Sequence, residues 1–419
     1  MKNSGVEWIG EIPEDWEVKP LTSLFSFGKG LPITKEDLKE NGIPVLSYGQ
    51  IHSKTNTGTN IQNDLLRYVD ESYLVSNPQS LVQRGDFIFA DTSEDLDGCG
   101  NCAYVNFDSK LFAGYHTVIL KSKDCSNNQY LAYLFKTDEW RKQIRAGLVE
   151  VKLYSISRKV LKKSSVILPP KSTQRRIASY LDKKCSKIEE TIQNQQQVIE
   201  KLKAYKQSLI TEAVTGKVKI ENGKVCGEYE SYKDSGVEWI GNIPSGWEVK
   251  KAKYFIKISN GSDPKTEEGD TPVYGSGAES FKTCVEFKEG PTVLIGRKGA
   301  TLHIPHYIEG NYWNVDTAFD VKTYSEEILL LKFYYYCATA FDYRFYLTST
   351  TLPSMTQTNY GNMYLPVPNT LVQKEIVEFL DNKYNAIDTA IEQKQNLIEK
   401  LTEYKKSLIY ECVTGKKEI

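Results

Sequence analysis

Residues 198–216 read VIEKLKAYKQSLITEAVTG, and residues 397–415 read LIEKLTEYKKSLIYECVTG. The two stretches are copies of one helical segment, and each ends in a glycine placed where a left-handed helix stop is expected. No Gly or Pro interrupts residues 174–214, which predicts a helix about 60 Å long at ~1.5 Å per residue. At the start of the second copy, Thr370 and Gln373 have the spacing of a capping box. The chain is therefore predicted to be organised around two long helices.

Apolar residues recur in both helices at alternating spacings of three and four, the seven-residue period of a coiled-coil seam. The expected seam residues are Leu181, Ile188, Ile192, Ile199, Leu202 and Leu209, with Leu380, Ile387, Ile391, Ile398, Leu401 and Leu408. Polar residues interrupt the seam at matching places. An antiparallel pair centred there would set Gln195 opposite Lys405 and Lys206 near Lys394, which would fix the register. The alternative is that the lysines simply reach solvent.

A second repeated element lies upstream of each helix. Residues 4–18 read SGVEWIGEIPEDWEV and residues 235–249 read SGVEWIGNIPSGWEV. The substitutions fall at charged or small positions, whereas the apolar residues are identical, which favours a structural joint over a catalytic site. The expected contacts between each globular part and the helices are Trp8, Ile9 and Trp16 in the first copy and Trp239, Ile240 and Trp247 in the second. We expect the first copy to meet the end of the second helix.

The bulk composition excludes several classes of protein. A chain of 419 residues suggests two to four domains, and 40% hydrophobic with 26% charged residues is typical of a globular protein. No run of about 18 apolar residues occurs, and the N-terminus lacks the apolar core of a signal peptide, so a cytoplasmic protein is expected. The net charge of −1 means that any nucleic-acid surface must come from local clusters. Cys99 and Cys102 form one CxxC, expected to be an ordinary loop without metal.

The repeated motifs together resemble the specificity subunit of type I restriction-modification systems. They are the duplicated SGVEWIGxIPxxWEV box, the proline-rich entry into a helix bearing Gln174 or Gln373, and the helix ends LITEAVTGK and LIYECVTGK. The resemblance covers the whole chain in the family's order. It implies a non-catalytic chain whose two target-recognition domains each read one half of a bipartite, asymmetric DNA site. The helix pair would set the spacer and dock modification subunits.

The resemblance also implies partners and cofactors. The partners are double-stranded DNA, two modification (methyltransferase) subunits and restriction/translocase subunits. S-adenosylmethionine, ATP and Mg would be bound by the partners, and no cofactor by this chain. The sequence agrees, since it has no GxxxxGK[ST] loop, no GxGxxG and no Asn/Asp-Pro-Pro-Tyr/Phe motif. The alternative is a specificity protein of a methylation-only or other phage-defence DNA-modification complex.

The predicted fold class is α+β: two globular α/β target-recognition domains are separated by two long helices forming an antiparallel coiled coil, with an internal pseudo-two-fold, nearly circular repeat. The expected boundaries are recognition domain 1 at 1–172, spacer helix 1 at 173–217, a linker at 218–234, recognition domain 2 at 235–371 and spacer helix 2 at 372–419.

Residues that would contact DNA are sought among cations and among polar loops at strand ends. A basic run at 140–164, opposed only by Glu150, holds Arg141, Lys142, Arg145, Lys152, Arg158, Lys159, Lys162 and Lys163. A solvated helix face is the alternative for this run. The stretches GDFIFADTSED (85–95) and GPTVLIGRKGATLHI (290–304) each read as a buried strand followed by a loop. These loops contribute Thr92 and Ser93 in the first block, and Arg297, Lys298 and Thr301 in the second.

Two further loops, each following a short strand after a proline, are expected to be equivalent to each other. They carry Tyr48 with Gln50 and Tyr274 with Ser276. Arg297 would bind guanine or a phosphate, and a surface salt bridge is the alternative. The run Tyr334–Tyr336 is expected to pack in a core, because duplex DNA hides the faces of its bases.

Overall fold

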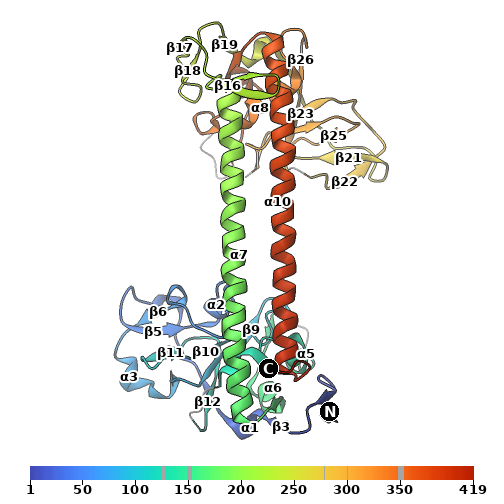
Figure 1. The fold of residues 1–419 in the computed structure, drawn as a ribbon. Coiled ribbons are helices and arrows are strands. Elements are labelled where there is room, and N and C mark those ends of the chain that lie inside the picture. The colour runs from blue at the N-terminus through green and yellow to red at the C-terminus, as the bar shows by residue number, and fades with distance from the viewer. Residues whose placement is uncertain (125–127, 149–152, 278, 300, 348–352) are drawn as a thin grey trace. The chain divides into compact units, whose positions relative to one another are not determined.

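The structure is a computed structural model. It describes residues 1–419 except 125–127, 149–152, 278, 300 and 348–352 (Figure 1). The chain divides into two compact units, which are residues 1–193 with 397–419, and residues 194–396. Each unit therefore contains one globular part together with a portion of both long helices. No described helix is both long and apolar enough to cross a membrane.

The two long helices are α7 (Lys171–Val214) and α10 (Thr370–Val413), each of 44 residues. Both start just after prolines, slightly earlier than predicted, and stop earlier than predicted. Gly216 (φ +71°) and Gly415 (φ +72°) adopt the left-handed conformation that was expected of a helix stop. At the first stop Lys217 N–H donates to the Glu212 carbonyl at 2.9 Å, the outer bond of a Schellman motif.

The N-terminus of α10 is capped differently from the prediction. Asn369 Oδ1 accepts from Val372 N–H at 3.0 Å, so Asn369 is the capping residue rather than Thr370. The fully buried Gln373 side chain instead donates to the Ile328 carbonyl (2.8 Å) and accepts from Leu330 N–H (2.9 Å). The expected capping box is thus wrong, because this amide is used to tie the helix entrance to the globular part.

The two helices pair in opposite directions within each unit. In the first unit, early α7 residues such as Leu181 share a core with late α10 residues such as Leu408. In the second unit, late α7 residues such as Leu209 share a core with the early α10 residue Leu380. The predicted antiparallel pairing is therefore confirmed. Most seam residues are buried, while the partly exposed ones are Ile192, Leu202, Ile391, Ile398 and Leu401.

The predicted register of the seam is wrong. The polar contacts between the helices are Lys394 Nζ to Gln195 Oε1 (3.1 Å), Lys206 Nζ to Asp388 Oδ1 (2.5 Å) and Lys405 Nζ to Glu189 Oε1. Gln195 therefore does not face Lys405, and Lys206 does not meet Lys394. A half-buried ammonium gains more from a carboxylate than from an amide or a second lysine, so the helices settle where Lys206 and Lys405 have acidic partners. Both lysine side chains are only 17% exposed, so they do not simply reach solvent either.

The first unit is built on an antiparallel sheet in the order β10–β8–β12–β4. These strands are β10 (Cys102–Tyr104), β8 (Phe87–Ala90), β12 (Thr117–Ser122) and β4 (Phe25–Lys29). Every residue of β8 is buried, and its side chains alternate between two cores. Phe87 and Phe89 face the core that contains α7 and α10, whereas Ile88 and Ala90 face a second cluster. The buried strand predicted in GDFIFADTSED is confirmed.

A second sheet of this unit has the order β6–β5–β11–β7, with β5 and β11 parallel. Its strands are β6 (Arg67–Val69), β5 (Ile43–Leu46), β11 (Leu111–Ala113) and β7 (Leu81–Val82). The remaining strands are β1 (Lys2–Asn3), β2 (Glu11–Ile12), β3 (Glu17–Pro20), β9 (Thr92–Ser93), β13 (Tyr154–Ser155) and β14 (Ser165–Leu168). The short helices are α1 (Leu21–Leu24), α2 (Tyr48–Ile51), α3 (Tyr73–Ser76), α4 (Gln129–Leu134), α5 (Asp138–Arg145) and α6 (Arg158–Lys163), with 3-10 turns η1 (Lys35–Asp37), η2 (Asn63–Leu65) and η3 (Pro78–Ser80).

The second unit repeats the same strand order from an unlike sequence. Its main sheet is β20–β26–β23–β24, and β21 pairs in parallel with β25 as β5 does with β11. These strands are β20 (Ile256–Asn260), β26 (Ala318–Thr323), β23 (Thr292–Gly296), β24 (His306–Ile308), β21 (Thr271–Tyr274) and β25 (Trp313–Asn314), with β22 (Lys282–Cys284) at the edge. The matching strands are therefore β8 and β23, β12 and β26, and β5 and β21.

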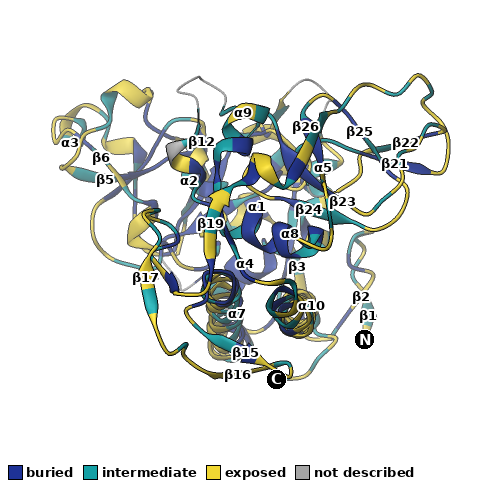
Figure 2. Ribbon diagram, turned by 90° about the horizontal axis from the view of Figure 1, so that it is seen from above, coloured by how far each residue is buried: buried dark blue, intermediate teal, exposed yellow. Residues whose placement is uncertain are grey.

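The remaining elements of the second unit connect this sheet to the helices. They are β15 (Lys219–Glu221), β16 (Lys224–Gly227), β17 (Tyr232–Asp234), β18 (Asn242–Pro244), β19 (Glu248–Lys251), β27 (Tyr364–Val367), α8 (Leu331–Ala340), α9 (Gln357–Asn362), η4 (Ala252–Tyr254) and η5 (Tyr343–Phe345). The segment 218–234, expected to be a linker, is thus largely a β-hairpin and a strand. Helix α8 is mostly buried, including Tyr334 and Tyr336, which confirms packing rather than stacking on bases (Figure 2).

The repeated box has the same backbone in both units. Gly10 and Gly241 have φ of +70° and +68°, and Trp16 N–H and Trp247 N–H each donate to the proline carbonyl three residues earlier. Trp16 and Trp247 are each 4% exposed, and Ile9 and Ile240 are buried. Trp8 and Trp239 are partly buried and pack against the cores of their units.

Each box packs on the stop of one long helix. A Cβ at Gly415 would lie 2.5 Å from Pro13 and 3.3 Å from Trp16, and a Cβ at Gly216 would lie 2.5 Å from Pro244. The first copy therefore lies against the end of α10, and the second copy against the end of α7. The glycines serve two needs there, a left-handed φ and the close approach of a proline ring.

We expect Gly415→Ala to destabilise the first unit by about 2–4 kcal/mol, because it adds backbone strain and a steric overlap with Pro13. Gly223→Ala is the matched control, since Gly223 has φ +69° but nothing within 4 Å of its Cβ position. It should lose only the conformational part, about 1 kcal/mol. Urea unfolding of the two variants would measure the difference. Equal losses would show that the box does not pack tightly on the helix stop.

Candidate nucleic-acid interface

In the first unit, three loops converge beside the ends of strands β5, β8 and β12. The loop after β8 holds Thr92 and Glu94, helix α2 follows β5, and His116 precedes β12. Together they enclose a cavity of about 700 Å³. Its lining residues are Tyr48, Gly49, His52, Thr92, Ser93, Glu94, Asp95, Asp97, Gly98, Asn101, His116 and Leu153. The structure thus brings together Tyr48 and Thr92, which were predicted from separate motifs.

A histidine holds two of these loops in place. His52 Nε2 lies 2.8 Å from the Thr92 carbonyl, and its Nδ1 lies 3.1 Å from Asn101 Nδ2. A carbonyl can only accept, so Nε2 must carry the proton, while Nδ1 accepts from the Asn101 amide. A neutral imidazole in this tautomer satisfies both contacts. The segment after β8 is therefore fastened to α2 through His52.

Two polar side chains of the cavity floor are used within the protein. Thr92 Oγ1 donates to Asp91 Oδ1 at 2.8 Å, and the same oxygen lies 3.3 Å from His116 Nδ1. The Tyr48 ring contacts His116 edge to face, with 5.2 Å between centroids. The cavity therefore presents an aromatic wall beside carboxylate, hydroxyl and imidazole groups.

Two of the predicted DNA contacts in this unit are hydrogen-bonded within the domain. Ser93 is 3% exposed and its hydroxyl donates to the Asp95 carbonyl at 2.7 Å, because pairing of β9 with β13 turns this residue into the domain. Gln50 Oε1 accepts from Ser47 N–H at 3.2 Å and so caps α2. Ser93 Oγ and Gln50 Oε1, from two residues predicted to contact DNA, are thus engaged in hydrogen bonds within the domain.

The basic run also divides into two groups. Arg141 Nε donates to the Phe135 carbonyl (2.9 Å), and burial lowers the pKa of Arg141. Arg145 Nε donates to the Leu96 carbonyl (3.0 Å), and its NH2 group pairs with Asp138 at 3.2 Å. These two arginines, expected to contact DNA, are instead bonded within the domain, and Arg145 fastens the loop after β8.

The other cations of the run are open to solvent. Lys142, Arg158 and Lys159 are exposed, and α6 follows β13, the strand that pairs with the loop after β8. Lys162 Nζ lies over the Phe27 ring at 5.7 Å, and Lys163 is exposed. Lys152 and Glu150 lie outside the described residues. Lys142, Arg158 and Lys159 therefore remain predicted phosphate contacts.

In the second unit, the loops after β21 and β23 also meet. Thr301 Oγ1 donates to the Ser276 carbonyl at 2.9 Å, which joins the two loops. Tyr274 and Ser276 are partly exposed and Lys298 is exposed. The expected equivalence of the Tyr48 and Tyr274 loops is supported by topology, since each follows the strand that has a parallel partner, β11 or β25.

The backbone and side chain of Arg297 are both held by contacts within the second unit. Its N–H donates to the Thr317 carbonyl (2.7 Å) and its carbonyl accepts from Met355 N–H (2.9 Å). Its guanidinium lies 5.9 Å from the Phe319 ring centroid, and NH1 donates to the Asp316 carbonyl at 3.4 Å. No ion pair of Arg297 with a carboxylate is found among the described residues. The alternative reading of Arg297 as one half of a surface salt bridge is thus not supported.

Asp91 holds the same backbone position in the first unit. Its N–H donates to the His116 carbonyl (3.0 Å), and its carbonyl accepts from Ile156 N–H (2.7 Å). Asp91 and Arg297 each follow the central strand directly, in β8 and β23 respectively. The two units thus place opposite charges at one equivalent point. An acceptor and a donor at the same place match different base edges.

Sequence reasoning missed His52, Asn101 and His116. Two of the four histidines in the chain line this cavity. The rarity of histidine was a possible signal, but the 64 positions between His52 and His116 hid their proximity in space. Asn101 carried no signal at all. Cys99 and Cys102 are buried, and Cys99 Sγ donates to the Asp95 carbonyl at 3.3 Å. Within the described ranges, no group of three or more His, Cys, Asp or Glu residues could hold a metal ion.

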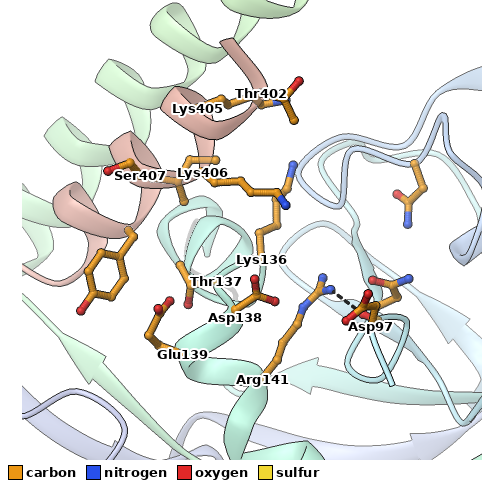
Figure 3. A pocket seen from close by; sticks show the side chains of 14 residues that line it. Asp97, Lys136, Thr137, Asp138, Glu139, Arg141, Thr402, Lys405, Lys406 and Ser407 are labelled. Carbon is orange, nitrogen blue, oxygen red and sulfur yellow. Dashed lines mark hydrogen bonds between the residues drawn. The ribbon is translucent and has the colours of Figure 1, made fainter. Parts of the chain in front are cut away.

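A second cavity, of about 560 Å³, lies in the first unit between α5 and the last turns of α10 (Figure 3). Lys136 points from the start of α5 toward α10, which contributes Thr402, Lys405 and Lys406. The pKa of Lys136 is lowered to about 8, mainly by burial and also by the nearby charges of Lys405 and Arg141, while Glu189 opposes these effects. The cavity between α5 and α10 is therefore lined by a lysine whose charged form is disfavoured in the folded protein.

Comparison with known proteins identifies a family. A model described as the type I restriction modification DNA specificity domain matches residues 13–204 and 244–400. The chain is 25% identical over 222 residues to the type I restriction enzyme MjaVIII specificity subunit of Methanocaldococcus jannaschii, which covers 51% of this chain and 49% of that protein. It is 28% identical over 284 residues to the putative MjaX specificity subunit of the same organism, covering 65% and 61%. These matches span less than two thirds of the relatives' own lengths.

The fold is also found among solved structures. A chain from work on complex assembly and conformational transition of the type I R-M system superposes with a TM-score of 0.70. The alignment covers 97% of this chain and 100% of that chain at 15% sequence identity. Likeness at that identity establishes a common fold, and so confirms the predicted fold class.

We expect Lys136→Met to stabilise the protein at pH 7. The pKa of Lys136 falls from 10.5 to about 8 on folding, so between these values the unfolded chain binds more protons and stability rises with pH. Below pH 8 the full penalty applies, at about 1.4 kcal/mol per pKa unit. Unfolding should therefore show a stabilisation that is largest at pH 7 and shrinks toward pH 10. Lys142→Met, at an exposed lysine of α5, should show no such trend, and the same behaviour in both variants would contradict the assignment.

Proposed function

This chain belongs to the type I restriction modification DNA specificity domain family, and from that premise we propose that it is a non-catalytic, sequence-specific DNA-binding subunit of a type I restriction-modification complex. Each unit reads one half of a bipartite, asymmetric site. The observation that carries this proposal is the repeated strand order. Two unlike sequences each form a sheet with the same strand order, and they present different side chains at the equivalent strand ends. A duplicated scaffold with divergent loops suits two readers of two different half-sites.

The helix pair is proposed to set the spacer between half-sites and to dock two modification subunits. Tyr205 on α7 and Tyr404 on α10 occupy the same place in the repeated helix and are 54% and 53% exposed. Tyrosine is enriched in protein interfaces, where it contributes large contact area at low entropic cost. One such residue in each unit suits two copies of one partner. Restriction/translocase subunits would then join the complex.

The cofactors of the complex are assigned to the partners. Modification subunits would bind S-adenosylmethionine, and the restriction/translocase subunits would bind ATP and Mg. The chain itself contributes DNA recognition through Tyr48, Thr92, Lys142, Arg158 and Lys159 in the first unit. In the second unit it contributes Tyr274, Ser276, Arg297, Lys298 and Thr301. The complex would act in the cytoplasm, where its DNA lies.

Arg297→Ala should weaken recognition of a guanine in one half-site and leave the other half-site unchanged. A bidentate arginine–guanine contact contributes about 1–3 kcal/mol of discrimination, so a loss of about 5- to 150-fold is expected. Single-molecule sequencing of methylated DNA, from cells expressing the complex with either chain, would report both half-sites at once. Arg344→Ala is the control, because this exposed arginine is already paired with Asp342 at 2.6 Å. Unchanged preference at every position of both half-sites would exclude Arg297 as a reader.

Replacing Tyr205 and Tyr404 by alanine together should reduce assembly with modification subunits by at least tenfold, and either single change should favour complexes holding one modification subunit. Native mass spectrometry of the mixed subunits would count the copies. Val225→Ala removes a side chain of an exposed residue in the β16 hairpin (47% exposed) and serves as control. Full assembly with two modification subunits in the double variant would place the docking surface elsewhere.

A further inference from the structure

One hydrogen bond joins the globular part to a long helix in both units. In the first, Tyr133 on α4 donates its hydroxyl to Asp182 Oδ1 on α7 at 2.6 Å. In the second, Tyr336 on α8 donates to Asp381 Oδ1 on α10 at 2.5 Å. The two aspartates follow Leu181 and Leu380, which are equivalent seam residues of the repeated helix.

A second donor reaches the same carboxylate in each case. Gln129 Nε2 donates to Asp182 Oδ1 at 3.2 Å, and Lys332 Nζ pairs with Asp381 Oδ2 at 2.9 Å. Gln129 precedes Tyr133 by four residues, as Lys332 precedes Tyr336, so each donor pair lies on one face of its helix. Each aspartate is therefore gripped at two points by one short helix. We call this arrangement the tyrosine clamp.

The tyrosines are committed to this contact. Tyr133 is 3% exposed and Tyr336 is 2% exposed, so both side chains are almost entirely removed from solvent. Burial, together with the adjacent aspartate, raises the pKa of both phenols, so that they remain donors at any physiological pH. A buried hydroxyl deprived of its acceptor is costly, which makes the clamp energetically specific.

The clamp differs in kind from the apolar part of the attachment, and it adds to other polar contacts such as those of Gln373 with Ile328 and Leu330. The surrounding cores, which contain Leu181 and Leu380, bury apolar surface, and apolar burial is non-directional. Apolar contacts alone would tolerate a small slide or rotation of the globular part along the helix. Two hydrogen bonds to one fixed carboxylate restrict both movements. The same device recurs in two units whose other sequences are unlike, which indicates a shared mechanical need.

We propose that the tyrosine clamps are positioning elements that fix each recognition domain on its helix and thereby enforce the spacer length between the two half-sites. This inference rests on the proposed function. Tyr133 and Asp182 act in the first unit, and Tyr336 and Asp381 in the second. None of these residues reads a base, so the clamps affect spacing and not half-site sequence.

The test uses the full chain assembled with its modification subunits. Methylation rates are compared on duplexes that carry the wild-type half-sites with the native spacer or with one base pair added or removed. Tyr133→Phe and Tyr336→Phe should each lower the ratio of native to altered-spacer rates about three- to tenfold, which corresponds to the loss of one hydrogen bond. Preference for the bases of each half-site should stay as in the wild type.

Conservative changes at the aspartates sharpen the test. Asp182→Asn keeps an oxygen that accepts from Tyr133 and from Gln129, so spacer discrimination should be retained, whereas Asp182→Ala should lose it. Asp381→Asn should lose part of it, because Lys332 then keeps only the more distant carboxylate of Glu309, at 4.0 Å. Tyr180→Phe, on the same helix as Asp182, is the matched control and should leave discrimination unchanged.

The outcomes separate the clamp from simple stability and from the proposed function. If the Phe variants lower the melting temperature or the overall rate but keep the wild-type ratio, the tyrosines are only structural and the proposal is overturned. If wild-type complex shows no bipartite site at all, the proposed function fails and the clamp is not at issue. A lowered ratio in the Phe variants and in Asp182→Ala, together with a wild-type ratio in Asp182→Asn, supports the proposal.

Discussion

The structure depends on the burial of one apolar seam against two different neighbours at once. Near each globular part, the seam residues of α7 and α10 face both the opposite helix and the sheet. Leu181 and Leu408 thus belong to one core with Phe87 and Phe89 of β8. Apolar burial contributes about 25 cal/mol per Å², so the helix ends and the sheet stabilise each other through this core. This shared core is why a unit combines residues 1–193 with 397–419.

Polar contacts then select one arrangement among those that apolar burial would allow. Lys206 and Lys405 interrupt the seam and find Asp388 and Glu189, while Lys394 finds Gln195. Half-buried ammonium groups left without acceptors would be costly, which penalises other registers. The repeated box adds a further constraint by closing on Gly216 and Gly415, where only glycine admits both the backbone and the proline ring.

The two units share one backbone arrangement and differ in the side chains that it presents. The strand order around β8 and β23 is the same, and the backbone bonds of Asp91 and Arg297 are equivalent. What differs is the side chain that the shared backbone presents. A carboxylate accepts hydrogen bonds and a guanidinium donates them, so one scaffold can address different base edges. This difference explains why the sequences of the two globular parts diverge while the repeated boxes and helix ends stay nearly identical.

The sequence by itself determined the repeat, the two helices and the buried strands, because periodicity and glycine stops are local properties. The antiparallel pairing of the helices was predicted from the matched polar interruptions, and the tertiary structure confirmed it. The sequence also placed Arg297, Tyr48 and Thr92 beside strand ends, although Tyr48 begins the short helix α2 and Thr92 lies in the short strand β9 rather than in loops. Only the tertiary structure decided the register, because Gln195, Glu189 and Asp388 compete for lysines across the pair. It also decided that Ser93, Gln50, Arg141 and Arg145 are occupied within the domain, and that His52 and Asn101 hold the site. Those outcomes depend on which donors and acceptors meet in space, and residue type and spacing along the chain carry no record of that.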